Sequence, residues 1–234
     1  MKTYKAQIVE VFSSIQGEGI FVGARQIFVR FRGCNMRCVF CDETHDKGWR
    51  DYSTQELIRE VRSLKMTHRP HHSVSLTGGE PLLHTEFLKE FLRLLEKEGF
   101  RSYLETNGTL PERLAEVIDL VDIIAMDFKL PSATGEREFW QEHKKFLNIA
   151  LKKKVFIKAV VTPGTKEEDI IKAASLVNKT GKDIPFILQP ATPQGFSGEK
   201  VNNSALIRFM DVALMNKLES VRVIPQVHKM LNMK

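Results

Sequence analysis

All three cysteines of the chain lie within eight residues, as Cys34, Cys38 and Cys41 in the segment GCNMRCVFCDE. An odd number of thiols crowded into one segment cannot form a disulfide framework. Thiolates are soft ligands for zinc and for iron–sulfur clusters. Three of them on one loop can hold three corners of a cuboidal cluster and leave the fourth iron open to a small chelating molecule. The triplet therefore predicts a metal site.

A closed zinc site is the alternative to a cluster. His45 follows Cys41 closely, so the three cysteines and His45 could form a Cys3His set. Structural zinc sites usually gather two ligand pairs from separate segments. Here all three cysteines follow one expected core strand, and a glycine loop follows the next strand. The combination of the cysteine triplet with the glycine loop favours the cluster over a zinc site.

The glycine loop is Thr77-Gly78-Gly79-Glu80-Pro81. Paired glycines let the backbone approach a ligand closely, and the exposed carbonyls can accept hydrogen bonds from an ammonium group. An ordinary tight turn would have the same composition. The loop gains functional meaning because it follows the cysteine triplet.

Short apolar runs alternate with longer segments of helical period, which is typical of βα units and a parallel sheet. The pattern predicts about six such units plus a terminal strand, with a Ser53–Glu56 capping box before the first helix and Gly99 closing the second. The expected strands are 27–33, 73–81 with its loop, 102–108, 121–127, 154–162, 185–190 and 221–225. The expected helices are 54–66, 84–99, 111–120, 136–151, 166–179 and 203–217.

Six units are too few for a closed eight-stranded barrel, so the prediction is an α/β fold with an open, partial, TIM-like (β/α)6 barrel. Active sites of such sheets lie at the carboxyl ends of the strands. The cysteine loop, the TGGEP loop, ETNG, MDFK and the Gln189-Pro190 pair all fall there. We expect these segments to meet at one rim.

Composition limits the remaining possibilities. The 234 residues carry 35 Lys and Arg against 29 Asp and Glu, and the net charge of +6 suits anionic small molecules or an acidic partner. The sequence has no basic stripe with interleaved aromatic residues, the pattern that would indicate direct nucleic-acid binding. No run approaches the ~18 apolar residues of a membrane span, and the N-terminus lacks a signal-peptide pattern. We expect one cytoplasmic domain over residues 1–234.

The cysteine spacing resembles that of the radical S-adenosylmethionine (SAM) enzymes, and five segments narrow the resemblance. They are VFSSIQGEG (11–19), RFRGCNMRCVFCD (30–42), TGGEP, ETNGT and RVIPQVHK (222–229). Together they are similar to the 7-carboxy-7-deazaguanine synthase family of queuosine and deazapurine biosynthesis. The resemblance implies a [4Fe-4S] cluster, catalytic SAM and Mg2+. It also implies 6-carboxy-5,6,7,8-tetrahydropterin as substrate, ring contraction with release of ammonia, a flavodoxin- or ferredoxin-type electron donor, and a homodimer.

The resemblance also assigns residues by position. Cluster ligands are Cys34, Cys38 and Cys41; SAM contacts are Phe40, Cys41, Asp42, Gly79, Glu105, Asp127, Phe128, Lys129 and Gln189; substrate contacts are Ile15, Gln16, Gly17, Arg30, Thr77 and His228.

Two segments depart from the family pattern, at three positions in all. Asp127-Phe128-Lys129 stands where many members have Ser-Pro-Lys, so only the lysine is retained. Glu43 replaces the Thr or Ser that binds Mg2+ in the family. A carboxylate is a hard oxygen ligand suited to Mg2+, so Glu43 is the expected ligand and Thr44 the alternative.

Two other functions compete with this assignment. A glycyl-radical activating enzyme would share the short chain, the triplet and the partial barrel, but the IQGEG and QVHK segments count against it. The second is a zinc-stabilised binding module without catalysis.

Overall fold

The computed structural model describes residues 4–42, 48–67, 70–181, 183–193 and 199–233. Within these ranges nine strands form one sheet in the order β3-β1-β2-β4-β5-β6-β7-β8-β9. Seven strands pair in parallel: β2 (Arg25–Phe31), β4 (Ser73–Gly78), β5 (Ser102–Thr106), β6 (Ile123–Asp127), β7 (Lys154–Val161), β8 (Phe186–Pro190) and β9 (Val221–Val223). The six predicted βα units and the terminal strand are confirmed.

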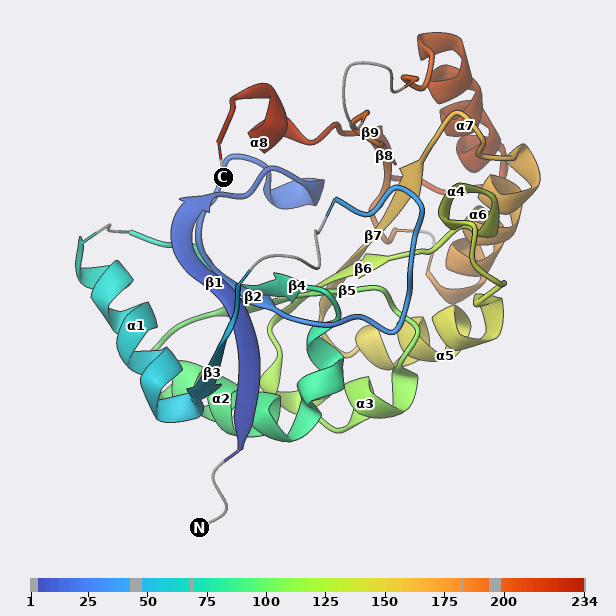
Figure 1. Ribbon diagram of the computed structural model, residues 1–234. Helices are drawn as coiled ribbons and strands as arrows, with labels where there is room; N and C mark the ends of the chain where they lie inside the picture. Colours follow the sequence, from blue (N-terminus) through green and yellow to red (C-terminus); the bar gives the residue numbers. More distant parts are fainter. Residues whose placement is uncertain (1–3, 43–47, 68–69, 182, 194–198, 234) are drawn as a thin grey trace.

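The longer helices lie along the outer side of the curved sheet (Figure 1). The longer ones are α1 (Thr54–Thr67), α2 (Thr85–Lys97), α5 (Trp140–Ala150), α6 (Glu167–Thr180) and α7 (Asn203–Met215). Shorter ones are η1 (Gly19–Phe21), η2 (Pro81–His84), α3 (Pro111–Ala115), η3 (Ile118–Leu120), α4 (Pro131–Thr134) and α8 (Val227–Met230). The described strands leave β3 and β9 as separate edges, so the predicted open, partial barrel is confirmed.

Local sequence explains where these helices begin and end. The Ser53 backbone N–H donates to the Glu56 carboxylate (2.9 Å), and the Glu56 N–H donates back to Ser53 Oγ (3.3 Å), which is the predicted capping box. Gly99 adopts φ +69° just after α2. The apolar face of α2 is buried through Phe87, Leu88, Phe91, Leu92 and Leu95. At about 1.5–3 kcal/mol for each large apolar side chain, this burial fixes α2 against the sheet.

The structure adds elements that the sequence pattern did not predict. β1 (Lys5–Ile15) runs antiparallel to β2, and β3 (Arg50–Ser53) runs antiparallel to β1. β1 mixes polar and apolar residues because most of it is only half-buried, so it lacks the signature of a parallel core strand. The helix expected at 111–120 is split into α3 and η3.

No helix among the described residues combines the length and the apolar character needed to cross a membrane.

Candidate functional site

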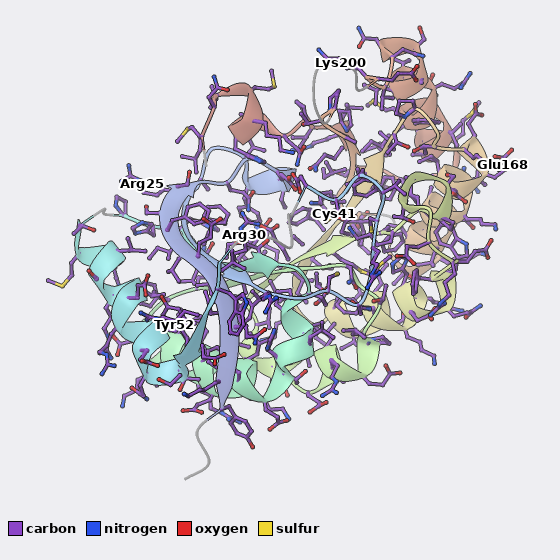
Figure 2. All side chains as sticks on the ribbon, in the orientation of Figure 1. Arg25, Arg30, Cys41, Tyr52, Glu168 and Lys200 are labelled. Carbon is purple, nitrogen blue, oxygen red and sulfur yellow. The ribbon has the colours of Figure 1, made fainter. Side chains whose placement is uncertain are left out.

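A cavity of about 1030 Å³ opens at the carboxyl ends of the parallel strands. Figure 2 shows Arg30 and Cys41 near the middle of the molecule, whereas Glu168 and Lys200 lie at its periphery. Sixteen of the eighteen residues singled out from the sequence line this cavity: Ile15, Gln16, Gly17, Arg30, Cys34, Cys38, Phe40, Cys41, Asp42, Thr77, Gly79, Glu105, Asp127, Lys129, Gln189 and His228. The expected convergence on one rim is present.

The cysteine loop follows β2. The thiols of Cys34 and Cys38 are half-buried and that of Cys41 is exposed. Burial raises the pKa of Cys34, and it raises the pKa of Cys38 to about 11 although the positive charge of Lys129 opposes the shift. Thiolates in this setting need a positive partner, which the irons of a cluster supply. The Asn107 side-chain amide, 3.9 Å from Cys34 Sγ, can donate to such a thiolate.

Among the described residues, no three His, Cys, Asp or Glu side chains gather as one shared metal ion requires. A [4Fe-4S] cube binds each thiolate at a different iron and does not require that arrangement. Glu43, Thr44 and His45 lie outside the described residues.

Gly79 brings the glycine loop against the cysteine loop. Its N–H donates to the Phe31 carbonyl (3.0 Å), and the next N–H, of Glu80, donates to the Gly33 carbonyl (2.8 Å). A Cβ on Gly79 would lie 1.8 Å from that Gly33 oxygen. Only glycine fits here, so the backbone of Gly79 stays beside Cys34 at the cavity wall.

The side chain of Glu80 has a structural role. Its buried carboxylate accepts hydrogen bonds from the N–H of Leu82 (3.0 Å), the hydroxyl of Thr106 (2.9 Å) and the N–H of Asn107 (2.8 Å). Burial raises the pKa of Glu80 to about 7. The carboxylate therefore joins the carboxyl ends of β4 and β5 beneath the cysteine loop.

A polar wall of the cavity is built around Glu105. Glu105 accepts hydrogen bonds from the Gln16 amide (2.9 Å) and from the hydroxyls of Ser75 (3.0 Å) and Thr77 (3.2 Å). Gln16 also donates to Gln26 (3.0 Å). These contacts fix the Glu105 carboxylate beside Gln16 and Thr77, both expected to bind substrate.

Arg30 and His228 complete this side of the cavity. Glu10 on β1 orients the Arg30 guanidinium through an ion pair of 2.9 Å. His228 packs so closely on Gly17 that a Cβ there would lie 2.1 Å from its Nδ1. The Val227 N–H donates to the Gly17 carbonyl (2.9 Å). The segment after β9 is therefore part of the wall.

Comparison with known proteins shows the family to which the chain belongs. The Radical SAM superfamily profile matches residues 28–177. A 7-carboxy-7-deazaguanine synthase of Geobacter sulfurreducens is 38% identical over 97% of each chain, and one of Methanothermobacter thermautotrophicus is 36% identical over 98% of each chain. The chain belongs to the 7-carboxy-7-deazaguanine synthase family.

The fold agrees with this membership. The crystal structure of QueE from Escherichia coli aligns with a TM-score of 0.65 at 23% identity, covering 96% of this chain and 95% of that one. As a radical SAM enzyme, this member of the 7-carboxy-7-deazaguanine synthase family uses a [4Fe-4S] cluster and SAM. Relatives of nearly full length do not favour the glycyl-radical activating enzyme or the zinc-stabilised module.

Two buried acceptor atoms in this family member fit SAM. Asp127 Oδ1 and Gln189 Oε1 have no hydrogen-bond donor among the described residues, and both side chains line the cavity. Buried polar atoms are rarely left unpaired. The hydroxyl groups of SAM are donors of the kind that such acceptor atoms can receive.

Phe128 requires a correction. Its ring is fully buried and stacks on His143, with centroids 4.7 Å apart. Successive residues at the end of β6 point to opposite sides, so Asp127 faces the cavity and Phe128 faces the core. The prediction that the Phe128 side chain contacts SAM is wrong.

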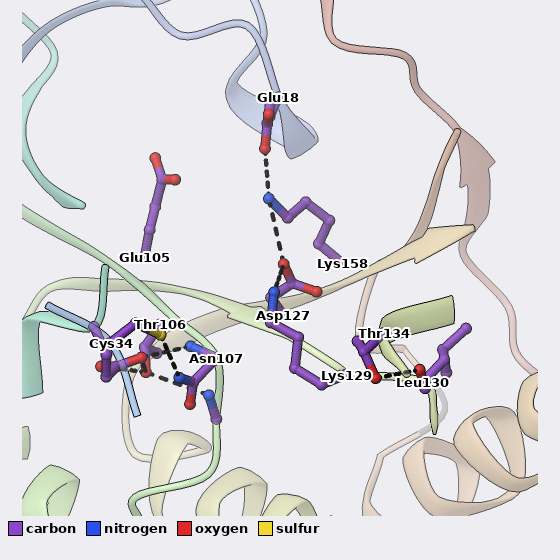
Figure 3. A network of polar contacts seen from close by, with 12 residues as sticks. Glu18, Cys34, Glu105, Thr106, Asn107, Asp127, Lys129, Leu130, Thr134 and Lys158 are labelled. Carbon is purple, nitrogen blue, oxygen red and sulfur yellow. Dashed lines mark hydrogen bonds and ion pairs between the residues drawn. The ribbon is translucent and has the colours of Figure 1, made fainter. Parts of the chain in front are cut away.

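The charged residues of the cavity that sequence reasoning missed include Lys158 and Glu18, which form a buried ion pair (Figure 3). A signal for Lys158 existed. It interrupts the apolar run of β7 at a position where the neighbouring residues are buried. Glu18 stood unassigned inside the IQGEG segment.

Proposed function

We propose that this enzyme converts 6-carboxy-5,6,7,8-tetrahydropterin to 7-carboxy-7-deazaguanine with release of ammonia, in queuosine or deazapurine biosynthesis. One observation carries the proposal: a single cavity joins the cysteine triplet and the glycine loop to the polar wall around Glu105. Relatives of nearly equal length named 7-carboxy-7-deazaguanine synthase support it.

We assign the cofactor side first. Cys34, Cys38 and Cys41 hold the cluster, and the close backbone at Gly79 receives the methionine part of SAM. Asp127, Lys129 and Gln189 bind the rest of SAM, with Phe40 and Asp42 beside the third cysteine. When bound, the cluster and SAM supply one-electron chemistry that removes a hydrogen atom from the substrate.

The substrate side consists of Ile15, Gln16, Gly17, Arg30, Thr77 and His228. The Arg30 guanidinium, oriented by Glu10, suits the carboxylate of the pterin. Glu105 belongs on this side as well, and not with SAM, because it shares hydrogen bonds with Gln16 and Thr77. Its carboxylate can accept from the amino and ring N–H groups of the pterin edge. These residues orient the substrate and exclude water.

Magnesium would help to hold the substrate carboxylate, with Glu43 as the proposed ligand and Thr44 as the alternative. A carboxylate is a hard ligand of the type that Mg2+ prefers.

We also propose how the enzyme works in the cell. Residues 1–234 act as one cytoplasmic domain, supported by the single nine-stranded sheet, and as a homodimer, supported by the exposed Ile207 and Met215 on α7. A flavodoxin- or ferredoxin-type protein supplies the electron. The exposed Arg37 and Val39 beside the cysteines offer it a positive and an apolar contact.

Anaerobic turnover tests the proposal. The reconstituted, reduced enzyme is given SAM, Mg2+ and 6-carboxytetrahydropterin, and the products are identified by mass spectrometry. We expect the deazaguanine acid and ammonia in equal amounts, and none from Cys38→Ala. Absence of the acid with a fully loaded wild-type cluster would refute this function.

The placement of Glu105 is tested separately. Glu105→Gln keeps the shape but removes the charge that the pterin edge would meet. We expect weaker binding of the substrate and unchanged binding of SAM in equilibrium measurements. Weaker binding of SAM alone would return Glu105 to the cofactor side.

A further inference from the structure

Lys158 on β7 lies between two segments with different proposed roles. Its Nζ is 2.5 Å from Glu18 Oε2 and 3.7 Å from Asp127 Oδ2. Glu18 belongs to segment 15–19 in the substrate wall, and Asp127 lies among the proposed SAM contacts. Figure 3 shows Lys158 between these two carboxylates, with Glu18 above it and Asp127 below.

These charges are mostly shielded from solvent. The side chains of Lys158, Glu18 and Asp127 are 14%, 16% and 12% exposed. Lys129 Nζ, 2.8 Å from Asp127 Oδ2, makes the group two cations and two anions. Such a buried group is stable only while each charge keeps its partner. Removing one member therefore affects the others.

Glu18 and Lys158 keep each other in their charged forms. Burial by itself would raise the pKa of Glu18, but the attraction of Lys158 outweighs it and holds that pKa below its usual value. Burial would lower the pKa of Lys158, yet the charges of Glu18 and Asp127 raise it.

The ion pair is one of the contacts that hold segment 15–19. Besides Lys158, Glu18 accepts a hydrogen bond from the Gln226 amide (2.8 Å), and the Glu18 N–H donates to Gln16 Oε1 (3.0 Å). Gln16 in turn holds Glu105. A shift of the Lys158 ammonium toward or away from Glu18 therefore reaches the substrate wall.

We propose that Lys158 is a positioning residue that couples the binding of SAM to the binding of the carboxypterin substrate. This inference rests on the proposed function. Hydroxyl groups of SAM that donate to Asp127 weaken its pull on Lys158, which strengthens the existing contact of Lys158 with Glu18 and holds segment 15–19 more firmly. Because binding coupling is reciprocal, each ligand tightens the other. Couplings of this kind are typically about 5- to 150-fold, so we expect a factor of about five or more.

The test measures SAM binding to the cluster-loaded enzyme under anaerobic conditions without reductant, so that no turnover occurs. Equilibrium dialysis gives the Kd of SAM with and without saturating 6-carboxytetrahydropterin. We expect the substrate to tighten SAM binding about fivefold or more in the wild type. Lys158→Gln should reduce this factor to below twofold, and Lys158→Arg should restore most of it. Lys154→Gln, at the exposed start of the same strand, should leave it unchanged.

A second variant covers failure of Lys158→Gln to fold or to load its cluster. The double variant Glu18→Gln/Lys158→Met removes both charges, leaves neither one unpaired, and should also show no coupling. The inference is overturned if the wild type shows no coupling, or if either loaded variant keeps the wild-type factor. Failure of the carboxypterin to bind the wild type at all, with SAM bound normally, would instead refute the proposed function.

Discussion

Gly79→Ala offers a demanding test of how the site is held together. The added Cβ would lie 1.8 Å from the carbonyl oxygen of Gly33, and ordinary contact begins at 3.4 Å. The two loops must therefore separate by 3.4 − 1.8 = 1.6 Å. The obstructing atom belongs to the backbone, so no side-chain rotation relieves the clash. Cys34 is covalently attached to Gly33 and moves with it.

A displacement of about 1 Å at a reacting centre can lower the rate about 100-fold. We therefore expect Gly79→Ala to lose at least that factor in turnover, with weaker SAM binding. The matched control is Gly164→Ala, whose Cβ would meet its nearest neighbour at an ordinary 3.6 Å.

The assay compares iron content, SAM affinity and the rate of product formation for both variants under anaerobic conditions. Wild-type rates and SAM affinity in Gly79→Ala would show that the contact between the two loops is not required, and would refute this reasoning.

Three further predictions concern single residues. Burial lowers the pKa of His143 from 6.5 to about 4, so the unfolded chain binds the proton more readily than the folded one. The contribution of His143 to the free energy of unfolding is therefore complete above pH 6.5. It falls by about 3 kcal/mol as the pH drops through 4. Urea unfolding of the cluster-free chain should show this slope, and His143→Phe should remove it; equal slopes would contradict the prediction. Phe128→Ala should lower the free energy of unfolding by about 3–5 kcal/mol without weakening SAM binding to the folded enzyme, whereas Asp127→Asn should weaken SAM binding. Weaker SAM binding in Phe128→Ala but not in Asp127→Asn would return Phe128 to the site. Chelation of Mg2+ should lower turnover, and Glu43→Ala but not Thr44→Ala should raise the Mg2+ concentration required; the reverse would make Thr44 the ligand.

Most of the fold was predictable because its determinants are local. The parallel strands, the Ser53–Glu56 capping box and the turn at Gly99 each follow from neighbouring residues. The rim also followed, since carboxyl ends of parallel strands meet at one edge. β1 could not be found in this way, because a half-buried antiparallel strand does not carry the continuous apolar run of a parallel core strand.

The polar partners of the site were harder to predict. Glu10 meets Arg30 only through the β1–β2 register, and Glu18 meets Lys158 across 140 residues of sequence. Such pairs depend on the tertiary fold, which no local pattern encodes. Phe128 was misassigned for a related reason: resemblance aligned a motif, whereas the alternation of side chains at the strand end decides which member faces the ligand.

The contact between Gly17 and the segment around Val227 and His228 has a consequence for how the enzyme is made. A polypeptide still emerging from the ribosome contains the cysteine loop long before it acquires this part of the cavity, because Cys41 precedes His228 by 187 residues. During synthesis the three thiols are therefore present well before the segment that completes the wall around the substrate, so the two parts of the cavity cannot form together.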